Sequence, residues 1–195
     1  MKSKILLFVL FSCLLLQSAV AATNVLSIYL VAKDEVAKEE EQATYETRVM
    51  ETKPDRLRLL SPPVLADADF VSFDWTNQTF VITPKAAQRL AAGIWSREGE
   101  VPTFLGNGVY ELIPFPTPFV VKASGEPVYV GAFYSLVFSS SFPGPFILAD
   151  TYAISSNTTS NVTLKIELNS PATADPRRDR RIFDALQKLF PNEKR

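Results

Sequence analysis

The chain contains no histidine, and its one cysteine, Cys13, lies within the first 21 residues. Beyond that point there is neither an imidazole nor a thiol, which excludes most zinc sites, haem ligation, disulfide bonds and the Ser–His and Cys–His nucleophile pairs. The sequence therefore predicts no metal site and no cofactor. No apolar run of about eighteen residues follows the first 21, so we expect no transmembrane helix in the mature chain.

Residues 1–21 have the composition of an export signal. Lys2 and Lys4 precede an apolar stretch over residues 5–16, and Ala19-Val20-Ala21 is a small-x-small cleavage site. We expect cleavage after Ala21 or Ala22 and a periplasmic or extracellular protein.

Cys13 offers an alternative to that cleavage. Leu10-Phe11-Ser12-Cys13 is loosely similar to the site at which bacterial lipoproteins are cut and acylated. A bulky phenylalanine stands where a small residue is usual, and an apolar stretch would remain on the mature protein. We therefore do not expect lipid anchoring at Cys13.

The charge of the chain argues against nucleic acid as a partner. Residues 22–195 carry 18 basic and 21 acidic side chains, a net charge of −3. Residues 175–195 hold seven basic and four acidic side chains, which predicts a basic tail on a domain that spans residues 22–174. The oligomeric state is left open.

Hydrophobic patterning predicts an α+β fold: an antiparallel sheet of five to seven strands with one short packed helix and a C-terminal amphipathic helix. Thr83-Pro84 is a typical helix start, since threonine accepts hydrogen bonds from free amides and proline suits the first helical position. We expect strands or strand pairs at residues 25–32, 57–60, 71–75 with 80–82, 109–113, 119–121 with 128–133, 146–154 and 162–168, and a helix from residue 176 onward.

Residues 33–53 form a charged run. Its acids fit a solvated helix or a mobile loop, and an acidic docking site is the alternative. Whether this run is ordered is left open.

Several of these segments together resemble a known family. A strand, the segment PPVLADADF, a second strand, a Thr-Pro-capped helix with AAQRLA and then PFVVKASGEPVYVGAF are similar to the head subdomain of the first periplasmic domain of the SecD protein-export subunit. The matching positions, within residues 25–133, are Pro63-Val64-Leu65, Asp67 to Phe70, Ile82-Thr83, Ala86-Ala87, Leu90-Ala91 and Val120-Val121 with Gly125 at the turn.

The resemblance implies a small α+β head that contacts extended polypeptide. The membrane spans with which SecD couples proton flow to export have no counterpart here, so the export motor itself is not implied. The long insertion at residues 94–118 and the basic tail also depart from the family pattern. Function is inferred here by analogy of fold.

Carboxylates are the remaining groups with catalytic potential. Asp67, Asp69 and Asp74 are close in sequence and suit acid–base chemistry, but capping and turn formation explain the first two, and strand alternation directs Asp74 to solvent. Two acids without a following glycine do not make a calcium loop. A carboxylate-dependent hydrolase stays an alternative hypothesis, as does a structural subunit whose tail helix docks on a partner.

Two groups of residues are candidates for binding. The first is a set of aromatic side chains interleaved with prolines, which lose little entropy on binding; the alternative is that they close over the core. The second is a set of arginines that suit an acidic partner or phosphate groups; the alternative is the solvated side of a helix. The aromatic residues are Phe115, Phe119, Tyr134, Phe138, Phe142 and Phe146, and the arginines are Arg177, Arg178, Arg180 and Arg181.

The leading functional hypothesis is an exported, non-catalytic binding or accessory protein of the bacterial envelope. We expect it to contact polypeptide or an envelope protein through a sheet edge or through the aromatic loops.

Overall fold

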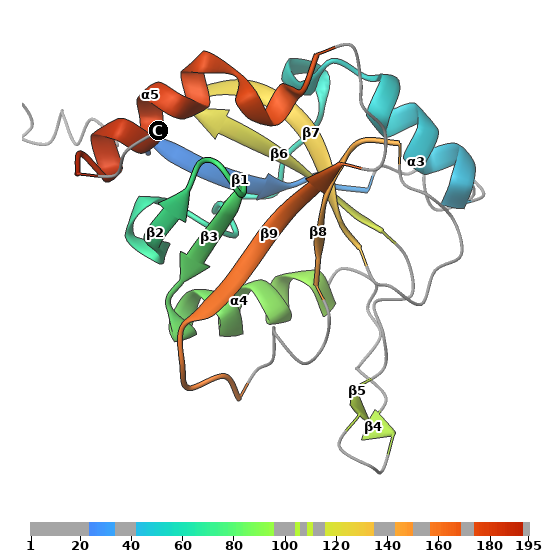
Figure 1. Cartoon of the computed structure of the whole chain (residues 1–195). Coiled ribbons are helices and arrows are strands. Elements are labelled where there is room, and N and C mark those ends of the chain that lie inside the picture. The colour runs from blue at the N-terminus through green and yellow to red at the C-terminus, as the bar shows by residue number, and fades with distance from the viewer. Residues whose placement is uncertain are drawn as a thin grey trace, which may run out of the picture.

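The computed structural model describes residues 24–33, 42–95, 104–105, 109–110, 116–134, 143–149, 157–168 and 174–192. Within these ranges, seven strands form one curled sheet in the order β1-β6-β7-β8-β9-β3-β2, and β4 pairs with β5 separately (Figure 1). The predicted export signal, which includes Cys13, and residues 34–41 lie outside the described ranges. The strands are β1 (Leu26–Leu30), β2 (Phe70–Asp74), β3 (Thr79–Ile82), β4 (Phe104–Leu105), β5 (Val109–Tyr110), β6 (Thr117–Ala123), β7 (Glu126–Tyr134), β8 (Pro145–Leu148) and β9 (Val162–Leu168).

The predicted α+β class is confirmed, with one difference in the sheet. Five of the six strand pairings in the sheet are antiparallel, but β7 and β8 are parallel. The expected strand at 57–60 is only an isolated bridge between Leu59 and Val31. The helices are α3 (Gln42–Glu51), α4 (Pro84–Trp95) and α5 (Arg180–Leu189), with short 3₁₀ turns η1 (Pro54–Arg56), η2 (Asp67–Asp69) and η4 (Pro176–Arg178).

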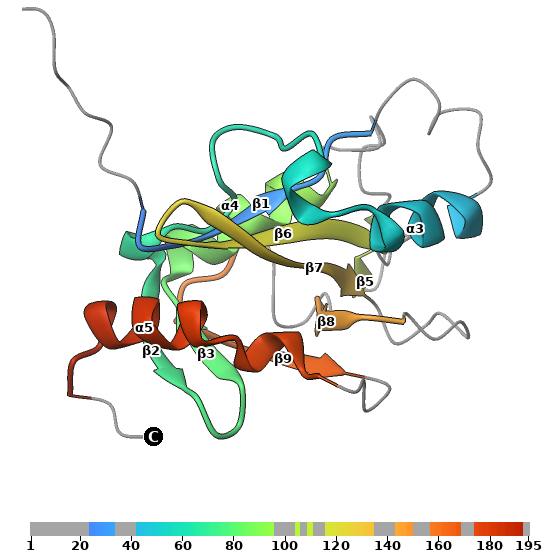
Figure 2. The same ribbon diagram turned by 90° about the horizontal axis from the view of Figure 1, so that it is seen from above.

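The sheet curls around the main hydrophobic core. Seen from above, β1, β6 and β7 form one side of the curl, and β8, β9, β3 and β2 form the other (Figure 2). All seven strands send side chains into this core, which also contains Leu90 of α4 and Leu186 of α5. In the view of Figure 1, α4 lies below the curl and α5 lies across its top, so the two helices cover opposite ends of the core.

The predicted helix start at Thr83-Pro84 is confirmed as the beginning of α4. The hydroxyl of Thr83 accepts a hydrogen bond from the amide of Ala86 at 3.2 Å, and Pro84 is the first helical residue. Ala86, Ala87 and Leu90 are fully buried. These residues mark the face of α4 that packs on the main core.

Part of the charged run is a helix with one buried side. Tyr45 and Val49 of α3 pack with Val31, Val120 and Val130, on the face of the sheet opposite the main core. The spacing of four residues puts both α3 side chains on one helical face. Helix α3 therefore covers the outer face of β1, β6 and β7.

Gly131 of β7 is required by a close approach of its neighbours. A Cβ built on this residue would lie 2.5 Å from the Phe119 ring and 2.8 Å from the carbonyl oxygen of Pro145. Both distances are shorter than real Cβ contacts, so glycine lets the Phe119 ring lie over β7 where β8 joins the sheet.

Candidate functional site

The two ends of the sheet are built differently, and the β1 end is covered. The amide of Ile28 donates to Leu65 O at 2.9 Å, and the amide of Val64 donates back to Ile28 O at 2.8 Å. Further along, Leu60 N donates to Leu30 O at 2.8 Å. The segment 57–66 therefore covers the outer side of β1 and bonds to the backbone of Ile28 and Leu30, which protects this edge from pairing with another chain.

Three charged side chains fasten this covering segment. The carboxylate of Asp67 accepts hydrogen bonds from Val25 N at 2.8 Å and Leu26 N at 2.7 Å. Asp69 accepts one from Ala66 N at 2.7 Å and forms an ion pair with Arg89 of α4. Asp69 thus caps the η2 turn, as predicted, whereas Asp67 binds the start of β1, a long-range contact that the sequence did not predict.

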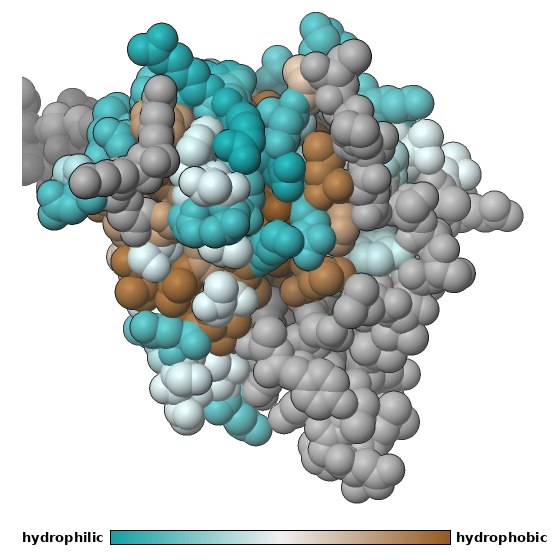
Figure 3. Space-filling model, in the orientation of Figure 1, coloured by the Kyte–Doolittle hydropathy of each residue, from teal (hydrophilic) through white to brown (hydrophobic). Residues whose placement is uncertain are grey.

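The β2 end is built as an open edge. Strand β2 is the last strand in the order, and no further strand in the described part of the chain pairs with its outer side. The pairing with β3 has a bulge between Phe70 and Ser72, and the side chain of Val71 there is 45% exposed. Figure 3 shows hydrophobic residues gathered at the lower left, over β2 and β3.

Aromatic side chains lie beside this edge, between β2 and α5. The ring of Trp75, just after β2, lies 5.2 Å from Phe183 of α5 and 6.1 Å from Phe73. The guanidinium of Arg178 lies 5.9 Å from the centre of the Trp75 ring. We call Phe73, Trp75, Phe183 and Arg178 the Trp75 ledge. Its tryptophan and arginine belong to the residue types enriched in binding hot spots.

Two of the predicted arginines hold α5 on the sheet. Arg177 binds the Asp175 carboxylate with two nitrogens, at 2.8 and 2.7 Å, and donates to Ile166 O at 2.8 Å. Arg181 forms the same two-point contact with Asp179, at 3.0 and 2.8 Å. These hydrogen bonds lower the pKa values of both carboxyl groups.

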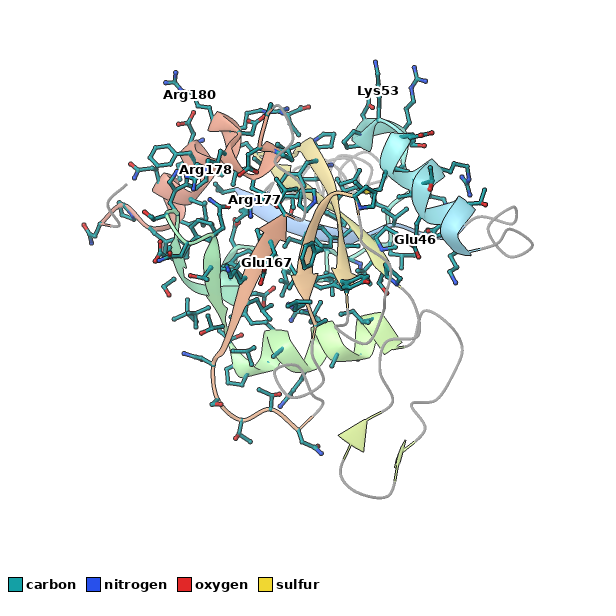
Figure 4. The ribbon with its side chains drawn as sticks, turned by 45° about the vertical axis from the view of Figure 1, so that its right-hand side comes forward. Glu46, Lys53, Glu167, Arg177, Arg178 and Arg180 are labelled. Carbon is teal, nitrogen blue, oxygen red and sulfur yellow. The ribbon has the colours of Figure 1, made fainter. Side chains whose placement is uncertain are left out.

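The other two arginines make longer contacts. Arg178 lies 3.8 Å from Asp175 and donates to Thr76 O at 3.3 Å, and Arg180 lies 3.7 Å from Asp184. Figure 4 shows Arg180 directed away from the body, whereas Arg177 lies near Glu167 at the end of β9. The four arginines therefore do not act as one group.

A small cavity lies under α5. Its volume is about 20 Å³, roughly the room for one water molecule, and mostly aliphatic and aromatic side chains line it. Tyr129 contributes its ring, and burial raises the pKa of its phenol far above the ordinary value.

The predicted aromatic group divides into buried residues and residues that the structure leaves undescribed. Phe119, Tyr134 and Phe146 are at most 6% exposed, so they belong to the core and not to a binding surface. Phe115, Phe138 and Phe142 lie outside the described residues. Sequence reasoning missed Trp75 and Phe183. Trp75 lies at the end of a predicted strand and Phe183 in the predicted tail helix, and both side chains are half-buried. These two positions were the sequence signal that could have indicated them.

Asp74, the third acid considered from the sequence, has a structural partner. Asp74 accepts from Asn77 N at 2.9 Å in the β2–β3 turn. Among the described residues, no group of three acids, histidines or cysteines is placed to hold a metal ion. In the same part of the chain, no helix is both long and apolar enough to cross a membrane.

Comparison of the chain with protein-family models, with curated proteins and with solved structures gave no match. The resemblance to the SecD head subdomain therefore stays a prediction.

Proposed function

We propose that the mature chain is an exported, non-catalytic binding protein of the bacterial envelope that takes up extended polypeptide at the outer side of β2. The contrast between the two sheet ends carries this proposal. Segment 57–66 bonds to the outer backbone groups of β1, whereas β2 ends the sheet with an exposed valine at its bulge. An extended chain can add to such an edge through backbone hydrogen bonds.

The chemistry of the described residues supports a binding role. Asp67 and Asp69 accept hydrogen bonds from backbone amides, and Asp74 stabilises a turn. The small cavity under α5 is lined mostly by apolar side chains. These features favour binding at a surface over reaction in a pocket.

A retention experiment tests the proposal. The mature chain is immobilised, and reduced, carboxymethylated α-lactalbumin, which stays unfolded in buffer, is passed over it. We expect saturable retention of the unfolded protein and none of the native, disulfide-bonded form. Equal retention of the two forms, or no retention of either, would contradict the proposal.

A further inference from the structure

We propose that the polypeptide bound at β2 places an apolar side chain on the Trp75 ledge and a carboxylate against Arg178. This inference rests on the proposed function, and it names the class of segment that the edge would select. Its basis is the arrangement of β2, the β2–β3 turn and the start of α5.

The direction of β2 leads a bound strand toward the ledge. Phe73 points into the core, and Trp75, two residues further on, continues the same side of the chain. A strand added to β2 would lie about 4.8 Å from it, with alternate side chains on this side. Those side chains would approach the half-buried rings of Trp75 and Phe183, which already pack edge to face.

Arg178 supplies the charge beside these rings. Its side chain is 48% exposed, its nitrogen lies 3.8 Å from Asp175, and its hydrogen bond to Thr76 O is 3.3 Å long. A charge-assisted hydrogen bond is ordinarily about 2.7–2.9 Å, so a carboxylate in the bound segment would offer Arg178 better geometry. Arg180 is 89% exposed, lies 3.7 Å from Asp184 and is directed away from the body (Figure 4), so the charge beside these rings is that of Arg178.

The neighbouring arginines give the contrast. Arg177 and Arg181 each hold a carboxylate of their own segment with two short hydrogen bonds. Most of their guanidinium N–H donors are therefore already used within the protein. Arg178 shares Asp175 with Arg177, which holds that carboxylate at 2.7 Å. The corner therefore complements an acidic partner through Arg178 more than through the arginines that hold α5.

Two peptides and one fluorescent reporter test the inference. Both peptides have nine residues with blocked ends. Along one face of the extended peptide, valine alternates with a charged residue, and the other face carries serine; the charged residue is glutamate in one peptide and lysine in the other. The chain has two tryptophans, so Trp95→Phe leaves Trp75 as the only reporter. We expect the glutamate peptide to bind about threefold more tightly, as exposed ion pairs allow, and to shift the Trp75 emission to the blue.

Variants separate the two proposals. Arg178→Gln should remove the preference for the glutamate peptide, whereas Arg58→Gln, at the covered β1 end, should keep it. If unfolded α-lactalbumin is retained but the peptides bind equally, or Trp75 emission does not change, the inference is wrong and the proposed function stands. If neither unfolded protein nor peptide binds, both are wrong.

Discussion

The two ends of the sheet solve the same physical problem in different ways. At β1, an irregular segment of ten residues, 57–66, follows the strand and bonds to its backbone, and Asp67 fixes the entry of the strand. At β2, the strand has five residues like β1 but is bulged, and no further strand in the described ranges lies beyond it. The bulge discourages uncontrolled pairing while leaving backbone groups accessible. The comparison shows that the β1 edge is covered by another segment, whereas the β2 edge is bulged but uncovered by any described strand.

The largest expected effect concerns the closed end. Asp67→Ala removes the acceptor for Val25 N and Leu26 N, and two partly buried amides then lose their partners. We expect the free energy of unfolding in urea to fall by about 2–3 kcal/mol. Asp74→Ala, which removes a carboxylate from the exposed turn at the open end, is the control and should have a clearly smaller effect. Equal losses would contradict the contrast between the ends.

Helix α5 borders the open end, and alkaline unfolding tests how firmly it is seated. Burial raises the pKa of Tyr129 above its value in the unfolded chain, so the folded state keeps its proton when the unfolded state loses it. The stability that the protonated Tyr129 phenol contributes is fully present below about pH 10. Above that pH, the free energy of unfolding falls, with a slope approaching about 1.4 kcal/mol per pH unit. Urea titrations at pH 9 to 11 measure this. In Tyr129→Phe, the free energy of unfolding should fall less steeply between pH 9 and 11. The same slope in the variant and in the unmodified chain would show that the phenol is not buried.

Charge placed on an exposed apolar side chain at each end of the sheet sharpens the comparison. Val71 and Leu60 are 45% and 40% exposed, and they lie at the open and closed ends respectively. A lysine at an edge disfavours strand addition. We expect Val71→Lys to weaken retention of unfolded α-lactalbumin about tenfold, the effect of about 1.4 kcal/mol. Leu60→Lys should leave retention unchanged. Loss of retention in Leu60→Lys alone would move the binding site to the other end.

The smallest expected effect is a loss of stability in acid at the start of α5. Hydrogen bonds from Arg177 lower the pKa of Asp175 in the folded state. Its contribution is present above the ordinary aspartate pKa of about 3.9 and is lost as the pH falls through the lowered value. Thermal unfolding between pH 5 and pH 2 measures it. Arg177→Gln should reduce the acid dependence, and an identical profile in the variant would show that the pair does not contribute.

Much of the fold follows from local signals in the sequence. Alternating residues indicated β1, two strand-like runs around Gly125 indicated the β6–β7 hairpin, and Thr83-Pro84 indicated the start of α4. The parallel pairing of β8 with β7 was not predictable in this way. It joins Ala132 to Phe146 and Tyr134 to Leu148, and such pairing depends on the path of the chain between the strands and not on either strand alone.

The candidate site was harder to predict than the fold. Phe119 and Phe146 were singled out because they stand near prolines, but β6 and β8 are covered on both faces, so nearly all of their side chains are buried. Trp75 and Phe183 are 108 positions apart, and no local pattern links the end of a strand to the side of a distant helix. The sequence identified the arginines as a group, whereas their roles depend on which of them Asp175 and Asp179 hold.

Amide hydrogen exchange, with and without unfolded α-lactalbumin, tests the central claim most directly. In the free protein, we predict slow exchange for residues 26–32 of the covered end and faster exchange for residues 70–74 of the open end. Addition of the unfolded protein should slow exchange in residues 70–76 and leave 26–32 unchanged. Protection that appears elsewhere, or no change at β2 while binding is saturated, would contradict the account.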